Sequence, residues 1–178
     1  MKGRMASLLL MGVMSLYGVQ ELEFRWKVKD FKDEEELVVR TFMQAAGYGP
    51  TSKEYMTKTV HKETEKIVHG IDGAHGLSVY CGQNCVGFIL VEYDREKNEI
   101  YIPRLAVCPT TQGRGLGKIL VKRMYETFKP QRMAVIARRK NGSGIKFYKK
   151  LGFYETEWLL PGKGPEKYCG LWCDNFNG

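Results

Sequence analysis

A glycine-rich turn over residues 112–118, with the sequence Gln-Gly-Arg-Gly-Leu-Gly-Lys, carries residue types that bind phosphate. Three glycines in five residues let the backbone pass close to a ligand. The apolar spacing after the turn predicts a helix, whose first N–H groups are unpaired and whose dipole is positive at this end. A phosphate group therefore fits the turn, with Arg114 and Lys118 either as its cationic partners or as ordinary solvated side chains.

Two common phosphate-binding motifs do not match the sequence of this turn. A P-loop needs Gly-x4-Gly-Lys-Ser/Thr, but Lys118 is followed by Ile119. The dinucleotide fingerprint Gly-x-Gly-x-x-Gly does not match glycines at positions 113, 115 and 117. The spacing Gln-x-x-Gly-x-Gly over residues 112–117 does match another pattern, and the turn resembles the acetyl-CoA pyrophosphate loop of the GNAT superfamily of N-acetyltransferases.

A second stretch supports this resemblance. Asn141 is followed by Ile-Lys-Phe-Tyr-Lys-Lys-Leu-Gly-Phe over residues 145–153, which resembles the asparagine and the FYxKxGF segment of the superfamily. It lies at the expected distance after the glycine turn. Together with Leu105-Ala106-Val107 before the turn, the resemblance is close over residues 76–160 and reaches the N-terminal helices only through the order of elements.

The elements that must position these motifs follow from hydrophobic periodicity and from turn residues. Strand patterns cover residues 21–28, 75–82, 84–95, 99–107, 131–138, 153–160 and 168–173, and helical patterns cover residues 33–47, 53–68, 116–128 and 142–151. This order, β-α-α-β-β-β-α-β-α-β-β, is that of the GNAT fold. We therefore expect one α/β (α+β) domain over residues 21–178, with a mixed, mostly antiparallel sheet of about six or seven strands flanked by helices.

Composition narrows the classes of partner. The chain has 178 residues, 43% of them hydrophobic, which suits one soluble domain with a sizeable core. Its net charge of +8 favours an anionic partner, for which the phosphates of CoA suffice. No nucleic acid is expected, because the basic residues are not clustered with aromatic ones. Five cysteines, an odd number, favour a reducing compartment, and their Cys-x3-Cys spacings do not suggest a metal site.

Residues 1–20 leave three interpretations open. They start with Lys2 and Arg4 and continue with an apolar run over residues 6–19, as a signal peptide or membrane anchor would. The run is shorter than the about 20 apolar residues that span a bilayer, and no Ala-x-Ala-like cleavage site follows. The second interpretation is a cytoplasmic N-terminal extension. The third is a misassigned start, with Met14 as the true first residue. A cytoplasmic protein is the expectation, since acetyl-CoA is found there.

The resemblance implies how acetyl-CoA would be bound. In this superfamily the strand corresponding to residues 99–107 bulges and separates from the next strand, and its backbone binds the pantetheine and the acetyl carbonyl. Pro103 suits such a bulge, because proline cannot donate to a sheet ladder. The residues implied in acetyl-CoA binding are Leu105, Ala106, Val107, Gln112, Gly113, Arg114, Gly115, Leu116, Gly117, Lys118, Asn141 and Tyr148.

Acetyl transfer to an amine also needs an acid for the departing thiolate. Tyr148 matches the tyrosine that is the general acid in many members of the superfamily. Phe147 next to it can fill the core and leave Tyr148 pointing at the gap between the strands. A plain aromatic residue on a helix face is the alternative, and Asn141 is a helix cap, a pantetheine ligand or both.

The base for the amine is less well specified by the sequence. Glu99 stands where the bacterial ribosomal-protein N-terminal-alanine acetyltransferases, which this segment resembles, carry an acidic base. Strand alternation without a slip puts Glu99 and Tyr101 on the same face as Pro103, Leu105 and Val107. A water chain through Tyr101 would then connect Glu99 to the amine. The alternative for Glu99 is a turn residue exposed to water.

These observations favour an N-acetyltransferase that moves the acetyl group of acetyl-CoA directly to a primary amine of a small molecule or a protein. The alternative is a non-catalytic CoA-binding regulatory module on the same fold. The sequence does not specify the acceptor, and a homodimer is compatible with it.

Overall fold

The computed structural model describes residues 21–26, 30–44 and 51–176. Its strands are β1 (Leu22–Arg25), β2 (Ala74–Cys81), β3 (Asn84–Asp94), β4 (Glu99–Val107), β5 (Arg132–Arg138), β6 (Tyr154–Thr156) and β7 (Tyr168–Cys173). Its helices are α1 (Lys32–Gln44), α2 (Thr51–His69), α3 (Leu116–Phe128) and α4 (Gly142–Lys150), with a 3₁₀ turn at Pro109–Thr111. The predicted order of elements is confirmed, and the apolar segment 1–20 lies outside the described residues.

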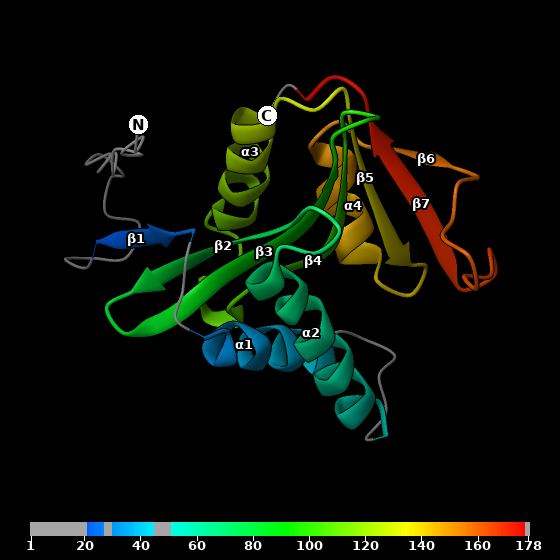
Figure 1. Cartoon of the computed structure of the whole chain (residues 1–178). Helices are drawn as coiled ribbons and strands as arrows, with labels where there is room; N and C mark the ends of the chain where they lie inside the picture. Colours follow the sequence, from blue (N-terminus) through cyan, green and yellow to red (C-terminus); the bar gives the residue numbers. More distant parts are fainter. Residues whose placement is uncertain (1–20, 27–29, 45–50, 177–178) are drawn as a thin grey trace, which may run out of the picture.

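A seven-stranded sheet in the order β1-β2-β3-β4-β5-β7-β6 forms the middle layer (Figure 1). The neighbouring strands are antiparallel except β4 and β5, which are parallel. The helices α1 and α2 lie along one face of the sheet, and α3 and α4 cover the other. The expected α+β fold with a mixed, mostly antiparallel sheet is therefore confirmed.

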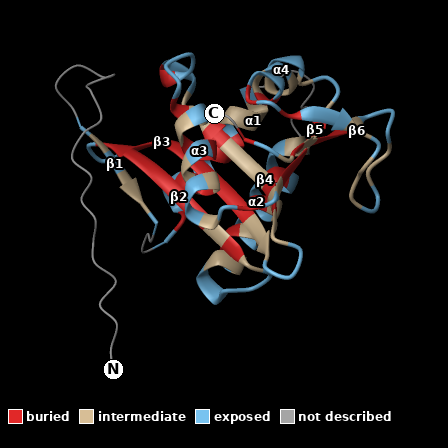
Figure 2. Ribbon diagram, turned by 90° about the horizontal axis from the view of Figure 1, so that it is seen from above, coloured by how far each residue is buried: buried red, intermediate tan, exposed pale blue. Residues whose placement is uncertain are grey.

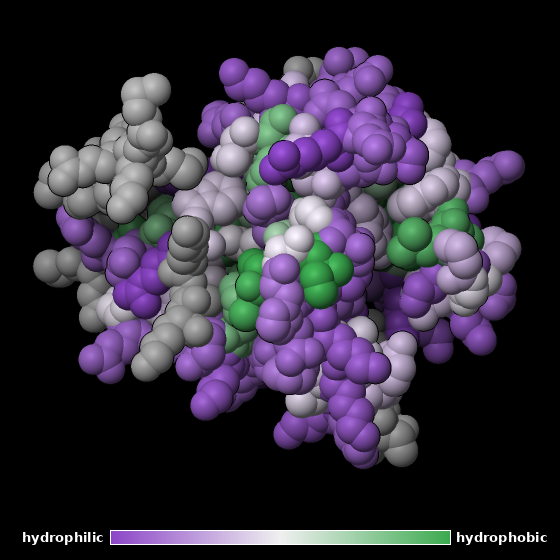
Figure 3. Space-filling view, in the orientation of Figure 1, coloured by the Kyte–Doolittle hydropathy of each residue, from purple (hydrophilic) through white to green (hydrophobic). Residues whose placement is uncertain are grey.

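Strand alternation explains why both faces of the sheet are covered. In β3, Phe88 and Leu90 pack against Val38 of α1 on one face, while Ile89 packs against Leu120 of α3 on the other. The central strands are accordingly buried on both sides, whereas the exposed residues lie mainly on the helices, the turns and the edge strand β6 (Figure 2). The outer surface in Figure 3 is mostly hydrophilic, with apolar residues in small separate patches.

The last strand does not lie at the edge of the sheet. It is inserted between β5 and β6, and pairs with β5 from Met133 to Arg138 but with β6 over only three residues. The strand predicted over residues 153–160 is thus shorter than expected. The backbone carbonyl of Trp158 lies against Gly170 of β7, so close that a Cβ at position 170 would collide with it. The chain has left the ladder by this point.

The described part of the chain contains no helix that is both long and apolar enough to cross a membrane.

The contact between α1 and α2 predicts a pH-dependent stability. His61 Nδ1 on α2 lies 3.1 Å from Glu35 Oε1 on α1, and this hydrogen bond raises the pKa of His61. A raised folded-state pKa adds stability below the unfolded pKa of about 6.5, and that stability is lost as the pH rises through the folded pKa. We therefore expect the melting temperature, followed by circular dichroism, to fall less from about pH 6 to pH 8 in His61→Gln than in the wild type.

His69→Gln is a suitable control, because His69 is exposed at the C-terminal end of the same helix, α2. It should keep the wild-type pH dependence. Identical pH profiles for the wild type and His61→Gln would contradict a role of this contact in stability.

Candidate active site

The parallel strands β4 and β5 separate after a short paired segment. Their ladder has three residue pairs, Glu99–Arg132, Ile100–Met133 and Tyr101–Ala134. Both strands are described in full and continue to Val107 and Arg138, but no further pairs join them. The predicted gap between these strands is therefore present, and the β5-facing backbone of the second half of β4 is outside the ladder (Figure 1).

A β-bulge lies beside this gap. Between the pairs Glu92–Tyr101 and Leu90–Arg104, β4 advances by three residues while β3 advances by two, so the extra residue lies in β4 near Pro103. Proline is compatible with such a position because no ladder hydrogen bond is lost there. The predicted bulge is confirmed.

The bulge corrects the predicted alternation of side chains along β4. Leu105 and Val107 pack on the α3 side, whereas Tyr101 lies opposite Glu92 and Glu99 lies opposite Asp94, on the α1–α2 side. The expectation that Glu99 and Tyr101 share a face with Leu105 and Val107 was wrong. It assumed no slip, and one inserted residue moves every preceding side chain to the other face.

The glycine turn has the backbone that an anion site needs. Gly113 and Gly115 have φ angles of 79° and 83°, which favour glycine, and Gly115 directly precedes α3. The N-cap residue Gly115 has no side chain to accept from the first N–H groups of α3, which leaves these donors to a ligand or to water. Gln112 ties the turn to the end of β4, because its Nε2 donates to the Val107 carbonyl over 3.0 Å.

The other residues of this segment that were predicted to bind acetyl-CoA differ in how far they are buried. The side chains of Ala106 and Leu116 are in the core, so these residues can contribute only backbone to a ligand. Gly117 lies against the Phe147 ring, where a Cβ would be 3.1 Å from Phe147 Cζ. Lys118 is exposed at the first turn of α3. Acetyl-CoA binding by these residues stays a prediction.

A cleft of about 450 Å³ opens between β4 and β5 and extends to α2 and α4. It brings together four of the residues predicted from the sequence, which are Tyr101, Leu105, Asn141 and Tyr148. The side chain of Asn141 caps α4 by accepting from the Gly144 N–H over 3.0 Å. The predicted helix cap is thus confirmed, and its pantetheine contact stays a prediction.

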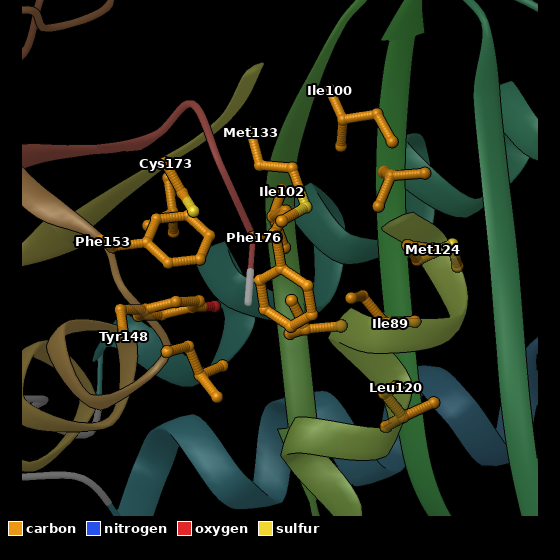
Figure 4. Packing of buried hydrophobic residues seen from close by; sticks show 14 of the residues in the cluster. Ile89, Ile100, Ile102, Leu120, Met124, Met133, Tyr148, Phe153, Cys173 and Phe176 are labelled. Atoms are coloured by element: carbon orange, nitrogen blue, oxygen red, sulfur yellow. The ribbon is translucent and has the colours of Figure 1, made fainter. Parts of the chain in front are cut away.

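Tyr148 is buried on the cleft side of α4, with 8% of its surface exposed. Its ring packs edge-on against Phe153 at 5.2 Å, and its hydroxyl points away from α4 toward the middle of the apolar cluster (Figure 4). Phe147 is only half-buried, so the expectation that Phe147 fills the core in place of Tyr148 was wrong. Burial, and secondarily Tyr101, raise the pKa of Tyr148, so its hydroxyl stays protonated at neutral pH.

Tyr101 faces the same cleft from β4. Burial raises its pKa to about 12, and its ring meets Trp158 edge-on at a centroid distance of 6.0 Å. Glu99 is not among the described residues that line the cleft. Its Oε1 accepts from Arg132 Nη1 over 3.2 Å at the paired start of β4 and β5. The structure therefore brings Tyr101 and Tyr148 together and leaves Glu99 outside.

Two pairs of charged residues in the cleft were not identified from the sequence. Arg104 Nη2 of β4 lies 2.9 Å from Glu63 Oε1 of α2, and Lys66 Nζ of α2 lies 2.8 Å from Glu92 Oε1 of β3. A signal was present, because polar residues at 59, 63 and 66 follow the helical spacing of the buried Met56 and Val60. Their meeting with β3 and β4 depends on tertiary packing.

The left-handed backbone at Gly115 predicts the effect of a substitution. A Cβ there would meet no atom within 4 Å, so Gly115→Ala adds backbone strain without a clash. We expect the free energy of unfolding to fall by about 1 kcal/mol. We also expect calorimetry to show that CoA binds about tenfold more weakly. This is the effect of losing one hydrogen bond from a backbone N–H to a charged phosphate oxygen.

Gly70→Ala is the matched control, because Gly70 has a φ of +64°, equally open surroundings and a position after α2. It should lower stability by a similar amount and leave the CoA affinity unchanged. Unchanged CoA binding in Gly115→Ala would refute the anion site at this turn.

Comparisons with known proteins agree with this geometry. Residues 44–153 match the model of the acetyltransferase (GNAT) family. No curated protein matches the chain. PaiA N-acetyltransferase from Thermoplasma acidophilum, solved in complex with coenzyme A, is 17% identical, with a TM-score of 0.72, over 87% of this chain and 99% of that one.

Another similar structure is the ribosomal-protein-S18-alanine N-acetyltransferase from Escherichia coli. It is 16% identical, with a TM-score of 0.63, over 89% of this chain and 97% of that one. At these identities the solved structures support the fold alone. Because the family model covers more than half of the chain, the protein belongs to the acetyltransferase (GNAT) family.

Proposed function

We propose that this protein is an N-acetyltransferase that transfers the acetyl group of acetyl-CoA directly to a primary amine. The observation that carries the proposal is the gap between β4 and β5, whose cleft Tyr148 lines from α4. PaiA of Thermoplasma acidophilum, a protein of the same fold, was solved with coenzyme A. The acceptor class, a cytoplasmic location and a homodimer stay predictions.

The acetyl donor would be held by backbone groups more than by side chains. The first N–H groups of α3 and those of the glycine turn suit the pyrophosphate, because they point outward at the positive end of the helix dipole. The backbone of β4 beyond Tyr101 has groups outside the ladder with β5, which suits the amide groups of pantetheine. Asn141, at the start of α4, has amide donors on the same side of the cleft.

Acetyl-CoA supplies an activated acetyl group as a thioester. The chain must then protonate the departing sulfur, because a thiol leaves more readily than a thiolate. Tyr148 suits this step, since its raised pKa keeps the proton on the hydroxyl until a strong acceptor forms beside it. Leu105, Phe147 and Leu160 line the cleft as well, and apolar side chains at the reacting sulfur would keep water from it.

A single-atom substitution tests this function. In Tyr148→Phe the ring and its packing on Phe153 are kept, and only the acid is lost. We expect the release of free CoA thiol from acetyl-CoA, followed with a panel of polyamines, aminoglycosides, amino acids and peptide N-termini, to fall by about 100-fold. CoA affinity should be unchanged.

Tyr125→Phe is the control, because Tyr125 is a half-buried tyrosine of α3 that packs on Phe176 away from the cleft. It should keep the wild-type rate. Tight binding of acetyl-CoA with no thiol release on any amine would instead favour a CoA-binding regulatory module.

A further inference from the structure

We propose that Glu63 of α2 accepts the proton of the acceptor amine, and that Arg104 of β4 is its positioning residue. This inference rests on the proposed acetyl transfer and adds the acceptor side of the site. It replaces Glu99 in that role, because Glu99 pairs with Arg132 outside the cleft.

The position of Glu63 is fixed by elements on two sides of the cleft. Its helix, α2, is anchored to the sheet by the buried residues Met56 and Val60, so Glu63 faces β4 one turn later. Arg104 follows the bulge at Pro103 and belongs to the part of β4 that has left β5. The ion pair of 2.9 Å between Glu63 and Arg104 therefore connects the helical wall to the strand that would bind the acetyl group.

The pair is buried and incompletely satisfied. The side chains of Glu63 and Arg104 are 17% and 16% exposed. Glu63 Oε2 and Arg104 Nε are buried without a hydrogen-bond partner among the residues that the structure describes. A carboxylate oxygen left in this state costs free energy, and an N–H donor from a ligand recovers it. Glu63 lines the cleft together with Arg104, so a ligand amine bound there lies within reach of this carboxylate.

The surroundings of Glu63 favour proton acceptance. Burial raises the pKa of its carboxyl, so it holds a proton more strongly than a surface carboxylate does. The charged groups that face it from the neighbouring elements act in both directions: Glu92 of β3 raises this pKa, and Arg104, Lys66 and Lys163 lower it.

Glu63 is also coupled to the predicted acid across the cleft. Burial is the main cause of the raised pKa of Tyr101, which Arg104 lowers and Glu63 raises, and burial followed by Tyr101 raises the pKa of Tyr148. The three groups line the same cleft, Glu63 from α2, Tyr101 from β4 and Tyr148 from α4. An amine bound in this cleft would therefore have a proton acceptor, Glu63, and a proton donor for the sulfur, Tyr148, in the same site.

The other carboxylates are less suited to this role. Glu92 is engaged by Lys66 over 2.8 Å, and Lys66 is also paired with Asp72 over 3.0 Å. An acceptor amine would have to displace this lysine to reach Glu92. At Glu63 the Oε2 atom has no such competitor among the described residues.

The proposed step balances in protons and electrons. The ammonium group of the acceptor gives one proton to the Glu63 carboxylate, and the nitrogen lone pair then forms a C–N bond with the acetyl carbon as the C–S bond breaks. The electron pair of the broken bond goes to sulfur. Tyr148 protonates the sulfur and regains a proton from the nitrogen, and Glu63 releases its proton to solvent, so the products are the amide, the thiol and one proton.

The experiment measures kcat and KM of Glu63→Gln from pH 6 to about pH 9.5 with an acceptor that the wild type acetylates. Glutamine keeps an oxygen for the bond with Arg104 and removes the base. We expect kcat at pH 7 to fall by about 100-fold, with CoA affinity unchanged in calorimetry. The deficit should shrink toward high pH, where a primary amine with a pKa of about 10.4 is increasingly deprotonated before it binds.

Glu65→Gln is the matched control, because Glu65 is two residues further along α2 and its side chain is 55% exposed. It should keep the wild-type profile. A loss in Glu63→Gln that is equal at every pH, or that comes with weaker CoA binding, would overturn the proposal and indicate that the ion pair only ties α2 to β4. Activity within twofold of the wild type would overturn it too.

A spectroscopic readout does not depend on turnover. The difference infrared spectrum between the wild type and Glu63→Gln reports the titration of this one carboxyl. We expect its midpoint above that of an exposed glutamate, about 4.3, and a midpoint below this value would exclude Glu63 as the base. A wild type that binds CoA but acetylates no amine would overturn the proposed function itself, whereas an active wild type with an unaffected Glu63→Gln would overturn only the role of Glu63.

Discussion

Three parallel residue pairs hold β4 to β5, and beyond them the two strands part although both continue. A sheet normally gains stability by extending its ladder, so this separation leaves backbone donors and acceptors in the middle of the fold without their usual partners. The rest of the structure is arranged around this separation. The cleft forms in it, α4 and α2 form its walls, and the glycine turn lies at the end of the strand that leaves the ladder.

The separation is stabilised from both faces. On one face the apolar cluster of α3 and α4 packs beneath β4, with Leu120 and Met124 fully buried beside Ile100 and Ile102. On the other, α1 and α2 cover β3 and the end of β4. Since β4 is firmly paired with β3 over nearly its whole length, it can lose β5 without becoming mobile. A rigid strand with unpaired backbone groups is suited to bind an extended amide-containing ligand, because little ordering is required on binding.

The glycine turn and the α2 wall of the cleft carry different charges. The glycine turn has only a backbone and exposed basic residues to offer, which suits an anion. The α2 wall has one charged residue of each sign in the cleft, with Glu63 paired to Arg104 of β4 and Lys66 paired to Glu92 of β3. A buried ion pair adds little net stability compared with an apolar pair, because the desolvation of both charges offsets their attraction. The Glu63–Arg104 pair, which is the less exposed of the two, therefore adds little net stability to the fold.

The sequence by itself determined the order of the elements, the family, the glycine turn, the helix cap at Asn141 and the bulge near Pro103. All of these depend on interactions between residues close in the chain, such as hydrophobic periodicity, positive φ angles and missing donors. The tertiary structure decided which face of the sheet each side chain of β4 takes. One inserted residue turned Glu99 and Tyr101 away from Leu105 and Val107, because the pairing of β4 with β3 sets the register on each side of the bulge. It also brought Glu63 of α2 to Arg104 of β4, residues 41 positions apart, because only the packing of the helix on the sheet sets their distance.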